Sequence, residues 1–310
     1  MSDLRSGSTF TPAVPAQPAG PPSATLAAYA AANGMHVSGE RPGLLNYVRQ
    51  LWERRDFIVT FSTARLAAQY STARLGQIWQ LLTPVFNAAV YYLIFGVLLE
   101  TNRGIHPFIA YLCCGVFVFN FTQQTVLAGC RAVPDNLGLI RALHFPRATL
   151  PISVMITQLQ QLMFSMLALM VIVLASGVAA TFAWLLIVPI LVLQSVFNVG
   201  LAMVMGRVGA KTTDIAQVMP FVTRTWMYAS GVFYKVSTFT EHAPAVVATA
   251  LRANPILVYI ELMRFALIGR RDQLASQPST LWVMGVAWAL LVGVAGFVYF
   301  WQAEEEYGRA

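Results

Sequence analysis

The stretch from Gln69 to Pro84, QYSTARLGQIWQLLTP, decides the fold, because a polar segment bearing an arginine meets a long apolar run within it. The run continues through residues 81–99 without a charged side chain. As a helix it would cover about 28 Å, close to the roughly 30 Å of hydrocarbon in a bilayer. Trp79 is typical of the head-group level, Pro84 permits a bend, and Gly76 allows close helix approach. We therefore expect the chain to enter a membrane here.

Composition points the same way. The chain has 310 residues, of which 57% are hydrophobic and 11% charged, whereas a soluble domain carries about 25% charged residues. The apolar runs leave too few residues for a soluble domain of useful size. One membrane domain is therefore a better interpretation than two soluble domains. The formal net charge of +7 could suggest nucleic acid, but no basic patch is interleaved with surface aromatics as such a site needs. We expect no nucleic-acid partner.

Six apolar runs predict an all-α polytopic membrane protein with six transmembrane helices. The predicted spans are residues 81–99, 108–127, 152–175, 184–205, 218–233 and 281–301. Between the last two, the region 235–268 holds an apolar run of only about 13 residues, Ile256 to Ile268, which is too short to cross. It predicts re-entrant extracytoplasmic helices, with another short helix near Pro244 to Leu251. Residues 69–310 would form one transmembrane domain.

The N-terminal part divides into two segments. Residues 1–43 are rich in Ala and Pro and predict a disordered cytoplasmic tail; no apolar core behind a basic start indicates a cleaved signal peptide. In residues 44–68, Leu, Trp and Phe recur at helical spacing while arginines take the other face. That pattern predicts an amphipathic helix lying in the membrane interface.

Lysine and arginine set the orientation, because cytoplasmic loops carry an excess of them. With the N-terminus inside, the short cytoplasmic loops hold five basic residues and the short outer loops hold one, Arg103. The five are Arg131, Arg141, Arg147, Arg207 and Lys211. We therefore expect a multi-pass protein of the plasma (inner) membrane with both termini in the cytoplasm.

Three stretches resemble the membrane subunits of ABC-2 type exporters, and within that family the permeases that export lipid-linked polysaccharide such as O-antigen or galactan. The first stretch matches a Tyr–x4–Leu-Gly–x2–Trp–x4–Pro pattern, and the run starting at Asn254-Pro255 keeps the family spacing to Glu261 and Arg264. The loop after the second span is the most specific match. The matching residues of the first stretch and the loop are Tyr70, Leu75, Gly76, Trp79, Pro84, Asn136, Leu139, Ile140, Arg141, Phe145, Pro146, Arg147, Leu150 and Pro151. The chain looks most similar to mycobacterial members that export galactan.

The resemblance implies a homodimer of permeases with two separate ATPase subunits, which would bind ATP and Mg²⁺, and a channel between the permeases. It also implies a polyprenyl-pyrophosphate-linked polysaccharide as substrate. Contact with the ATPase would fall to Asn136, Leu139, Arg141, Phe145, Pro146 and Arg147. Pro146 and Pro151 stiffen this connection, so a short helix near Asp135–Leu143 could transmit a push. An ordinary inter-span loop held by prolines is the alternative.

Charged and aromatic residues in or beside the spans are the candidate substrate contacts. Arg224 lies within the fifth predicted span, where an ionisable group is costly; it could line the channel or serve as a structural partner. Sugars stack on aromatic rings, so Tyr91, Phe117, Phe121 and Tyr228 are candidate channel residues. Glu261 and Arg264, three residues apart on one helix face, predict a structural ion pair that orients the re-entrant gate helices.

Arginines at the cytoplasmic interface are candidates for binding the head group of an anionic lipid carrier. They are Arg54, Arg55, Arg65 and Arg74. General attraction to anionic membrane lipids is the alternative for at least half of them.

Catalytic motifs are missing from the sequence. The aspartates are isolated and the histidines lack metal-ligand spacing, so we expect no metal site and no enzyme activity. The segment Gly206 to Thr212, GRVGAKT, lacks the Gly-Lys pair of a nucleotide-binding loop and follows an apolar span, so we expect no cofactor on this chain. Export of a smaller amphiphile, a drug or a lipid, is the runner-up function, and a membrane-embedded transferase is a weaker alternative.

Overall fold

The computed structural model of the chain describes residues 43–71, 74–98, 105–143 and 145–307. These residues form helices joined by turns, with no strand among them. The predicted tail, residues 1–43, lies outside the described residues except for Gly43. The α-helices are α2 (Leu44–Glu53), α3 (Arg55–Tyr70), α4 (Trp79–Tyr91), α5 (Phe108–Arg131), α6 (Leu137–Ala142), α7 (Thr149–Ala175), α8 (Ile187–Lys211), α9 (Ile215–Ala229), α10 (Val236–His242), α11 (Ala245–Arg252), α12 (Pro255–Ile268) and α13 (Pro278–Gln302).

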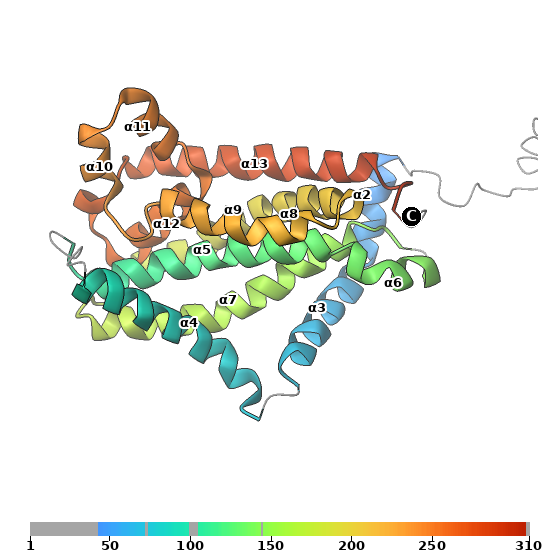
Figure 1. Cartoon of the computed structure of the whole chain (residues 1–310), viewed down its shortest axis with the longest axis horizontal. Helices are drawn as coiled ribbons and strands as arrows, with labels where there is room; N and C mark the ends of the chain where they lie inside the picture. The colour runs from blue at the N-terminus through green and yellow to red at the C-terminus, as the bar shows by residue number, and fades with distance from the viewer. Residues whose placement is uncertain (1–42, 72–73, 99–104, 144, 308–310) are drawn as a thin grey trace, which may run out of the picture. The chain divides into compact units, whose positions relative to one another are not determined.

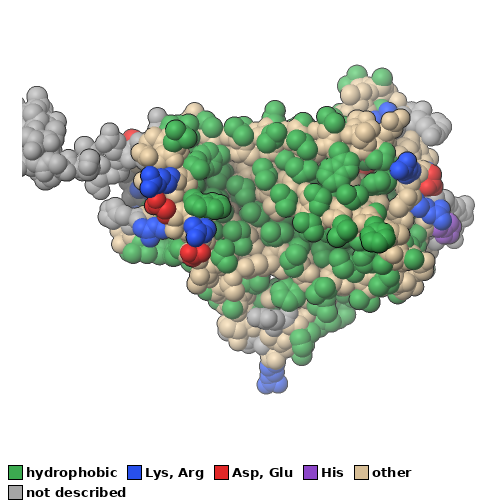
Figure 2. Space-filling model, turned by 180° about the vertical axis from the view of Figure 1, so that it is seen from behind, with side chains coloured by type: hydrophobic (Ala, Val, Ile, Leu, Met, Phe, Trp, Pro, Cys, Tyr) green, Lys and Arg blue, Asp and Glu red, His purple; other side chains and the backbone are tan. Residues whose placement is uncertain are grey.

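Five helical segments in the described part of the chain are long and apolar enough to cross a membrane. They are Trp79–Leu98, Phe108–Arg131, Thr149–Ala175, Phe182–Lys211 and Pro278–Gln302. The pair α11 and α12, bent by 64° at its break, would count as a sixth if it formed one span. Figure 2 shows hydrophobic side chains over the middle of one face and charged side chains gathered toward its two ends. The predicted class, an all-helical polytopic membrane protein, is confirmed.

Helix α5 forms the centre of this bundle (Figure 1). In its apolar window 72% of the residues are buried, against 17% in the segment Trp79–Leu98 that contains α4. Large side chains of α5 such as Tyr111, Phe117 and Phe119 are almost completely buried. Helix α5 is therefore the core of the subunit, whereas α4 lies at its periphery with most of its surface uncovered.

Glycines allow the backbone of α8 to contact the backbones of α13 and α5. A Cβ atom on Gly200 of α8 would overlap the carbonyl of Val292 in α13, and one on Gly296 would overlap the carbonyl of Gly200. A Cβ atom on Gly209 would overlap the carbonyl of Cys130 at the end of α5. In a membrane, where lipid is as apolar as the side chains, such close approach provides the van der Waals contact that holds helices together.

The predicted fifth span, residues 218–233, is not among the helices long enough to cross a membrane, and the helix in this region begins three residues and ends four residues earlier than predicted. Helix α9 runs from Ile215 to Ala229 and has 15 residues, about 22 Å at 1.5 Å per residue, which is short of the hydrocarbon thickness. It ends because Gly231 adopts a left-handed conformation with φ of 61°, which turns the chain away. The count of six spans therefore depends on α11 and α12, not on α9 alone.

The predicted interface helix, residues 44–68, is two helices. The chain turns at Arg54, whose φ and ψ are −95° and 10°, and this turn separates α2 from α3. In α2 the apolar Leu45 and Trp52 are exposed by 88% and 71%. That exposed apolar face is what a membrane-interface helix would present, and its position in the interface stays a prediction.

The connection between α3 and α4 needs glycine for its backbone, not for packing. Gly76 has φ of 51°, a conformation that glycine adopts at little cost, and no neighbouring atom lies within 4 Å of the position of its missing Cβ. The expectation that Gly76 lets helices approach closely is therefore wrong. Its role is to turn the chain where α3 and α4 meet at an angle (Figure 1).

The two ends of the bundle hold different elements. Helices α2 and α6 and the C-terminal turn lie at one end, and α10 and α11 lie at the other (Figure 1). Two short helices, α11 and α12, occupy the region where the sequence predicts them, and the 64° bend between them is compatible with a re-entrant loop, which stays a prediction. The predicted coupling segments and the predicted gate helices thus lie at opposite ends.

Candidate functional site

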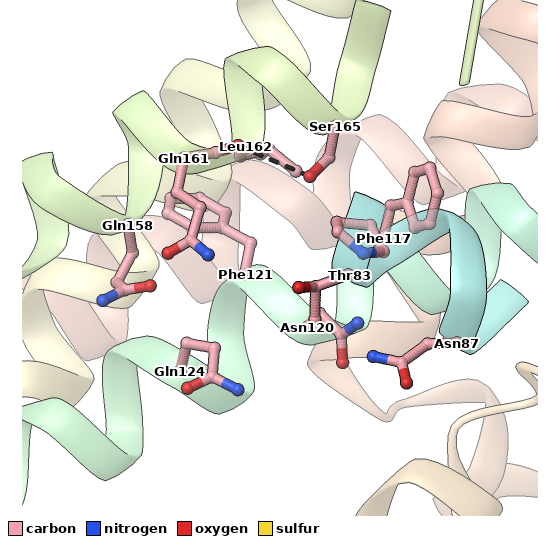
Figure 3. A pocket seen from close by; sticks show the side chains of 11 residues that line it. Thr83, Asn87, Phe117, Asn120, Phe121, Gln124, Gln158, Gln161, Leu162 and Ser165 are labelled. Carbon is pink, nitrogen blue, oxygen red and sulfur yellow. Dashed lines mark hydrogen bonds between the residues drawn. The ribbon is translucent and has the colours of Figure 1, made fainter. Parts of the chain in front are cut away.

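A polar cavity lies among α4, α5 and α7, midway along α5 and α7 (Figure 3). Its volume is about 90 Å³, enough for a few water molecules. No lining residue carries a formal charge. The lining residues are Thr83, Pro84, Asn87, Phe117, Asn120, Phe121, Gln124, Gln158, Gln161, Leu162 and Ser165.

Helical spacing explains why these amides meet. Asn120 and Gln124 are four residues apart in α5, and Gln158 and Gln161 are three apart in α7, so each pair lies on one helix face. Asn87 is contributed by α4 and appears next to Asn120 in Figure 3. Each amide offers both donors and an acceptor. The cavity can therefore bind hydroxyl groups in either hydrogen-bonding sense.

Two of the predicted channel residues line this cavity. Phe117 and Phe121 belong to α5 and are exposed by only 1% and 3%, and their side chains lie beside those of Asn120 and Gln161 (Figure 3). Aromatic rings next to amides make a surface that can stack on an apolar ring face and hydrogen bond at the edge of the same ligand.

The other aromatic candidates gather around Phe233. The ring of Tyr91 lies 5.2 Å from the ring of Phe233 between centroids, that of Tyr228 lies 5.5 Å away, and that of Phe95 stacks on it at 4.2 Å. These rings come from α4, from the π-helical segment Tyr92–Leu98 that follows it, from α9 and from the turn after α9. Tyr91 and Tyr228 therefore belong to one aromatic cluster, separate from the cavity lining.

A polar strip continues from the cavity onto the face formed by α5 and α9. Gln123 of α5 donates a hydrogen bond of 3.1 Å to Thr223 of α9, so the two helices are in contact at the level of the next residues, Gln124 and Arg224. Both are exposed, as is Asn87 of α4. Exposed amides and an arginine at this depth are costly against hydrocarbon, so this face requires a polar neighbour.

The predicted ion pair between Glu261 and Arg264 is not formed. The guanidinium of Arg264 instead donates hydrogen bonds to the backbone carbonyls of Tyr111, Gly231 and Val232, at 3.3, 3.0 and 3.0 Å, and lies over the Tyr111 ring at 3.3 Å from its centroid. Arg264 thereby satisfies the carbonyls of Gly231 and Val232, which are left free where α9 ends.

Glu261 has a different partner. Its Oε1 accepts a hydrogen bond of 2.9 Å from the backbone N–H of Ala275, which holds the connection between α12 and α13. Although Glu261 and Arg264 are one helical turn apart, each binds backbone in a different loop. The two residues brace the segments on either side of α12, and neither lines the cavity.

The predicted coupling segment is structured around α6. Asn136 donates from its side chain to the carbonyl of Ala132 at 2.8 Å, and Phe145 lies 6.0 Å from Phe57 of α3 between ring centroids. Leu139 is half-buried, Arg141 is exposed, and Pro146 is buried. Arg147 contributes its backbone N–H to Glu304 at 2.8 Å. These contacts connect the segment to α3 and to the C-terminal turn.

The four candidate head-group arginines do not form one cluster of equivalent side chains. Arg54, Arg55 and Arg74 are exposed, and Arg55 donates to the carbonyl of Trp52. Arg65 is half-buried, and its Nη1 is buried without a hydrogen-bond partner in the described part of the chain. Among the four, Arg65 therefore has the strongest reason to bind an anionic group.

The amides of the cavity are not among the candidates predicted from the sequence, because a neutral amide in a span is a weaker signal than a charge or an aromatic ring. Asn87, Asn120, Gln124, Gln158 and Gln161 all stand in otherwise apolar spans, and polar residues in spans are uncommon and usually face other helices or cavities. Their three- and four-residue spacing was the available signal. What it could not show is that three helices direct these side chains to one place.

Comparison with known proteins agrees with this architecture. Residues 58–268 match the family described as ABC-2 type transporter, so the chain belongs to that family. It is 25% identical over 214 residues to the "O-antigen export system permease protein RfbA" of Myxococcus xanthus, an alignment that covers 69% of this chain and 81% of that protein. A protein of the same name from Klebsiella pneumoniae is 19% identical over 208 residues, covering 67% of this chain and 80% of the relative.

Proposed function

We propose that this chain is the transmembrane permease subunit of an exporter that moves a lipid-linked polysaccharide across the plasma membrane. The observation that carries the proposal is the uncharged cavity of amides and phenylalanines among α4, α5 and α7. Sugar hydroxyls are matched by amide donors and acceptors, and the apolar faces of sugar rings are matched by Phe117 and Phe121. The names of the relatives, which are permeases of O-antigen export, support the same substrate class.

The exposed polar strip supports assembly as a homodimer. Asn87, Gln124 and Arg224 lie on a face that lipid would not solvate. A second copy placed against this face would enclose a polar path, to which Tyr91 and Tyr228 would add their rings. In this arrangement Arg224 lines the path. The dimer would then carry two equivalent cavities along one channel.

ATP hydrolysis is assigned to a separate subunit, present in two copies, which would bind ATP and Mg²⁺. The segment Gly206–Thr212 that bears a faint likeness to a nucleotide-binding loop contributes its residues up to Lys211 to α8. The ATPase would contact the end of the bundle that carries α2 and α6. We propose that this end and both termini face the cytoplasm, because the distribution of basic residues favours that orientation.

The carrier lipid is proposed to approach along α3. The free guanidinium nitrogen of Arg65 suits a pyrophosphate oxygen, because a charge-assisted hydrogen bond is stronger than a neutral one. Arg54, Arg55 and Arg74 would add long-range attraction. Within the polysaccharide class, galactan on a polyprenyl pyrophosphate is the specific substrate we propose, on the resemblance of the sequence motifs to mycobacterial galactan exporters.

Depletion of the chain in its host tests the function. Lipid-linked polymer should accumulate on the cytoplasmic side while its synthesis continues, since synthesis does not require the permease. Sugar analysis of the accumulated polymer identifies it as galactan or another glycan. Normal surface polymer after depletion, together with loss of efflux of a small amphiphile, would support the alternative function instead.

Purified alone, the chain should hydrolyse no ATP above a buffer control, and co-purification with the ATPase encoded beside it should give a stable complex that does. Phosphate release measured for the lone chain and for the complex in the same detergent checks this. Hydrolysis by the lone chain that persists after removal of every other protein would contradict the assignment of ATP hydrolysis to a separate subunit.

Substitution of the cavity amides tests the substrate path. In the double variant Asn120→Leu/Gln158→Leu, two hydrogen-bonding groups of the cavity lining are lost, and we expect polymer export by the reconstituted complex to fall about tenfold. Gln161 is left unchanged, because it also donates to the hydroxyl of Tyr70 in α3 at 3.1 Å. The control is Gln160→Leu, because Gln160 lies on the same turn of α7 but donates to Thr63 outside the cavity. Equal export by the double variant and the control would show that the substrate does not pass through the cavity.

A further inference from the structure

A hydrogen-bonded junction joins three segments at the end of the bundle that carries α2 and α6. The hydroxyl of Tyr47 in α2 donates to Oε2 of Glu304 at 2.7 Å and accepts from the backbone N–H of Ala148 at 3.0 Å. The other carboxylate oxygen of Glu304, Oε1, accepts from the backbone N–H of Arg147 at 2.8 Å. Glu304 follows α13, and residues 147 and 148 precede α7, so two side chains connect three parts of the chain.

The groups that form these hydrogen bonds are shielded from water, so losing a bond would leave a buried polar group without a partner. Tyr47 is exposed by 1%, Glu304 by 7%, and Ala148 not at all. Burial raises the pKa of Glu304, opposed by its hydrogen bonds from Arg147 and Tyr47, and burial likewise raises the pKa of Tyr47. Its hydrogen bonds and the nearby positive charge of Arg147 compensate Glu304 for leaving water.

Helix α2 depends on this junction for its attachment. Only Tyr47 and Leu51 of its ten residues are buried, and the Tyr47 ring also lies 5.9 Å from Phe297 of α13 between centroids. The turn at Arg54 separates α2 from α3. Without the Tyr47 hydroxyl, α2 would keep its apolar packing but lose its polar connection to the start of α7 and the end of α13.

We propose that Tyr47 and Glu304 are positioning residues that make α2, the segment 147–148 and the end of α13 move as one unit. The inference rests on the proposed function, because the unit lies where an ATPase subunit would press. A force on α2 or on the segment 147–148 then reaches α7, which lines the polar cavity, and α13 together. The acidic C-terminal turn is thereby part of the transmission between ATP hydrolysis and transport.

The first test uses the full chain alone and does not require transport. In Tyr47→Phe the ring remains and only the hydroxyl is lost, so we expect amide hydrogen exchange in residues 44–53 and 147–149 to rise about tenfold. Glu304→Gln should give an effect of the same kind, and the double variant should add little, because both changes break one junction. Additive effects would overturn the junction as a single unit.

The second test measures coupling in the complex with its ATPase, as the number of ATP molecules hydrolysed per polymer exported. We expect Tyr47→Phe to raise this ratio severalfold while the rate of ATP hydrolysis is retained. Tyr307→Phe is the matched control, since its hydroxyl donates only to Phe300 within the same C-terminal region. A wild-type complex that exports polymer, with an unchanged ratio in Tyr47→Phe, would refute the inference and leave the function standing. A wild-type complex that exports nothing would refute the function, while the exchange experiment would still decide whether the junction exists.

Discussion

Gly200→Ala should abolish most of the properly folded protein. The new methyl group would overlap the Val292 carbonyl, which belongs to backbone and cannot rotate away, so α8 and α13 must separate. We expect a loss of about 3 kcal/mol or more in the free energy of unfolding, or a fall of about 6 to 12 °C in the unfolding temperature. Thermal unfolding in detergent, followed by size-exclusion chromatography, measures it.

Gly138→Ala is the matched control for this change. Gly138 lies in α6, and no atom lies within 4 Å of the position of its missing Cβ, so alanine should be tolerated and should stabilise the helix by up to about 1 kcal/mol. If Gly200→Ala unfolded at the same temperature as the unchanged protein, the backbone contact between α8 and α13 would not hold the bundle together.

Arg264→Met should have an effect of similar size for a different reason. The substitution keeps much of the apolar stem but removes the donors to three backbone carbonyls, those of Tyr111, Gly231 and Val232. The carbonyls of Gly231 and Val232 lie outside any helix and would be left without a partner at about 1–3 kcal/mol each, so a total loss of at least about 2 kcal/mol is expected. The turn after α9 should become accessible to protease or to amide exchange.

Two further variants sharpen that experiment. Gly115→Ala should act in the same direction, since its methyl group would come within 2.8 Å of Nη2 of Arg264. Arg270→Met serves as the control, because Arg270 is exposed and an exposed substitution usually changes stability by less than about 0.5 kcal/mol. Equal stability of the Arg264 and Arg270 variants would show that the carbonyl contacts contribute little.

The helices themselves could be predicted because a span must satisfy its own backbone in hydrocarbon. A run such as residues 152–175 therefore specifies a helix with little help from its neighbours, and α7 occupies that region. The position at which α9 ends and the turn at Arg54 could not be predicted in this way. In α9 the apolar run continues through Val232 and Phe233, but the left-handed conformation of Gly231 ends the helix earlier.

The site shows the same division between local and long-range information. The three-residue spacing of Glu261 and Arg264 predicts that they share a helix face, but it does not determine which groups they hydrogen bond to. Arg264 reaches carbonyls at residue 111 and at residues 231 and 232, contacts that depend on how α5, α9 and α12 pack. Likewise, Phe117 and Phe121 could be chosen as candidates from their chemistry, whereas the amides from α4 and α7 join them only in three dimensions.

The neutral lining of the cavity among α4, α5 and α7 also affects how easily a polymer can move past it. A hydroxyl that leaves one amide can be taken up by the next at nearly the same energy, so the energy along the path should vary by only about 1 kcal/mol per hydrogen bond, little more than thermal energy. A fixed charge inside the cavity would trap any polymer that carries the opposite charge, and the one arginine proposed for the path, Arg224, is not among the residues that line the cavity. The cavity itself therefore has no preferred stopping point and no intrinsic direction, and a chain of many sugars can slide through it repeat after repeat. Direction must then be imposed at its ends.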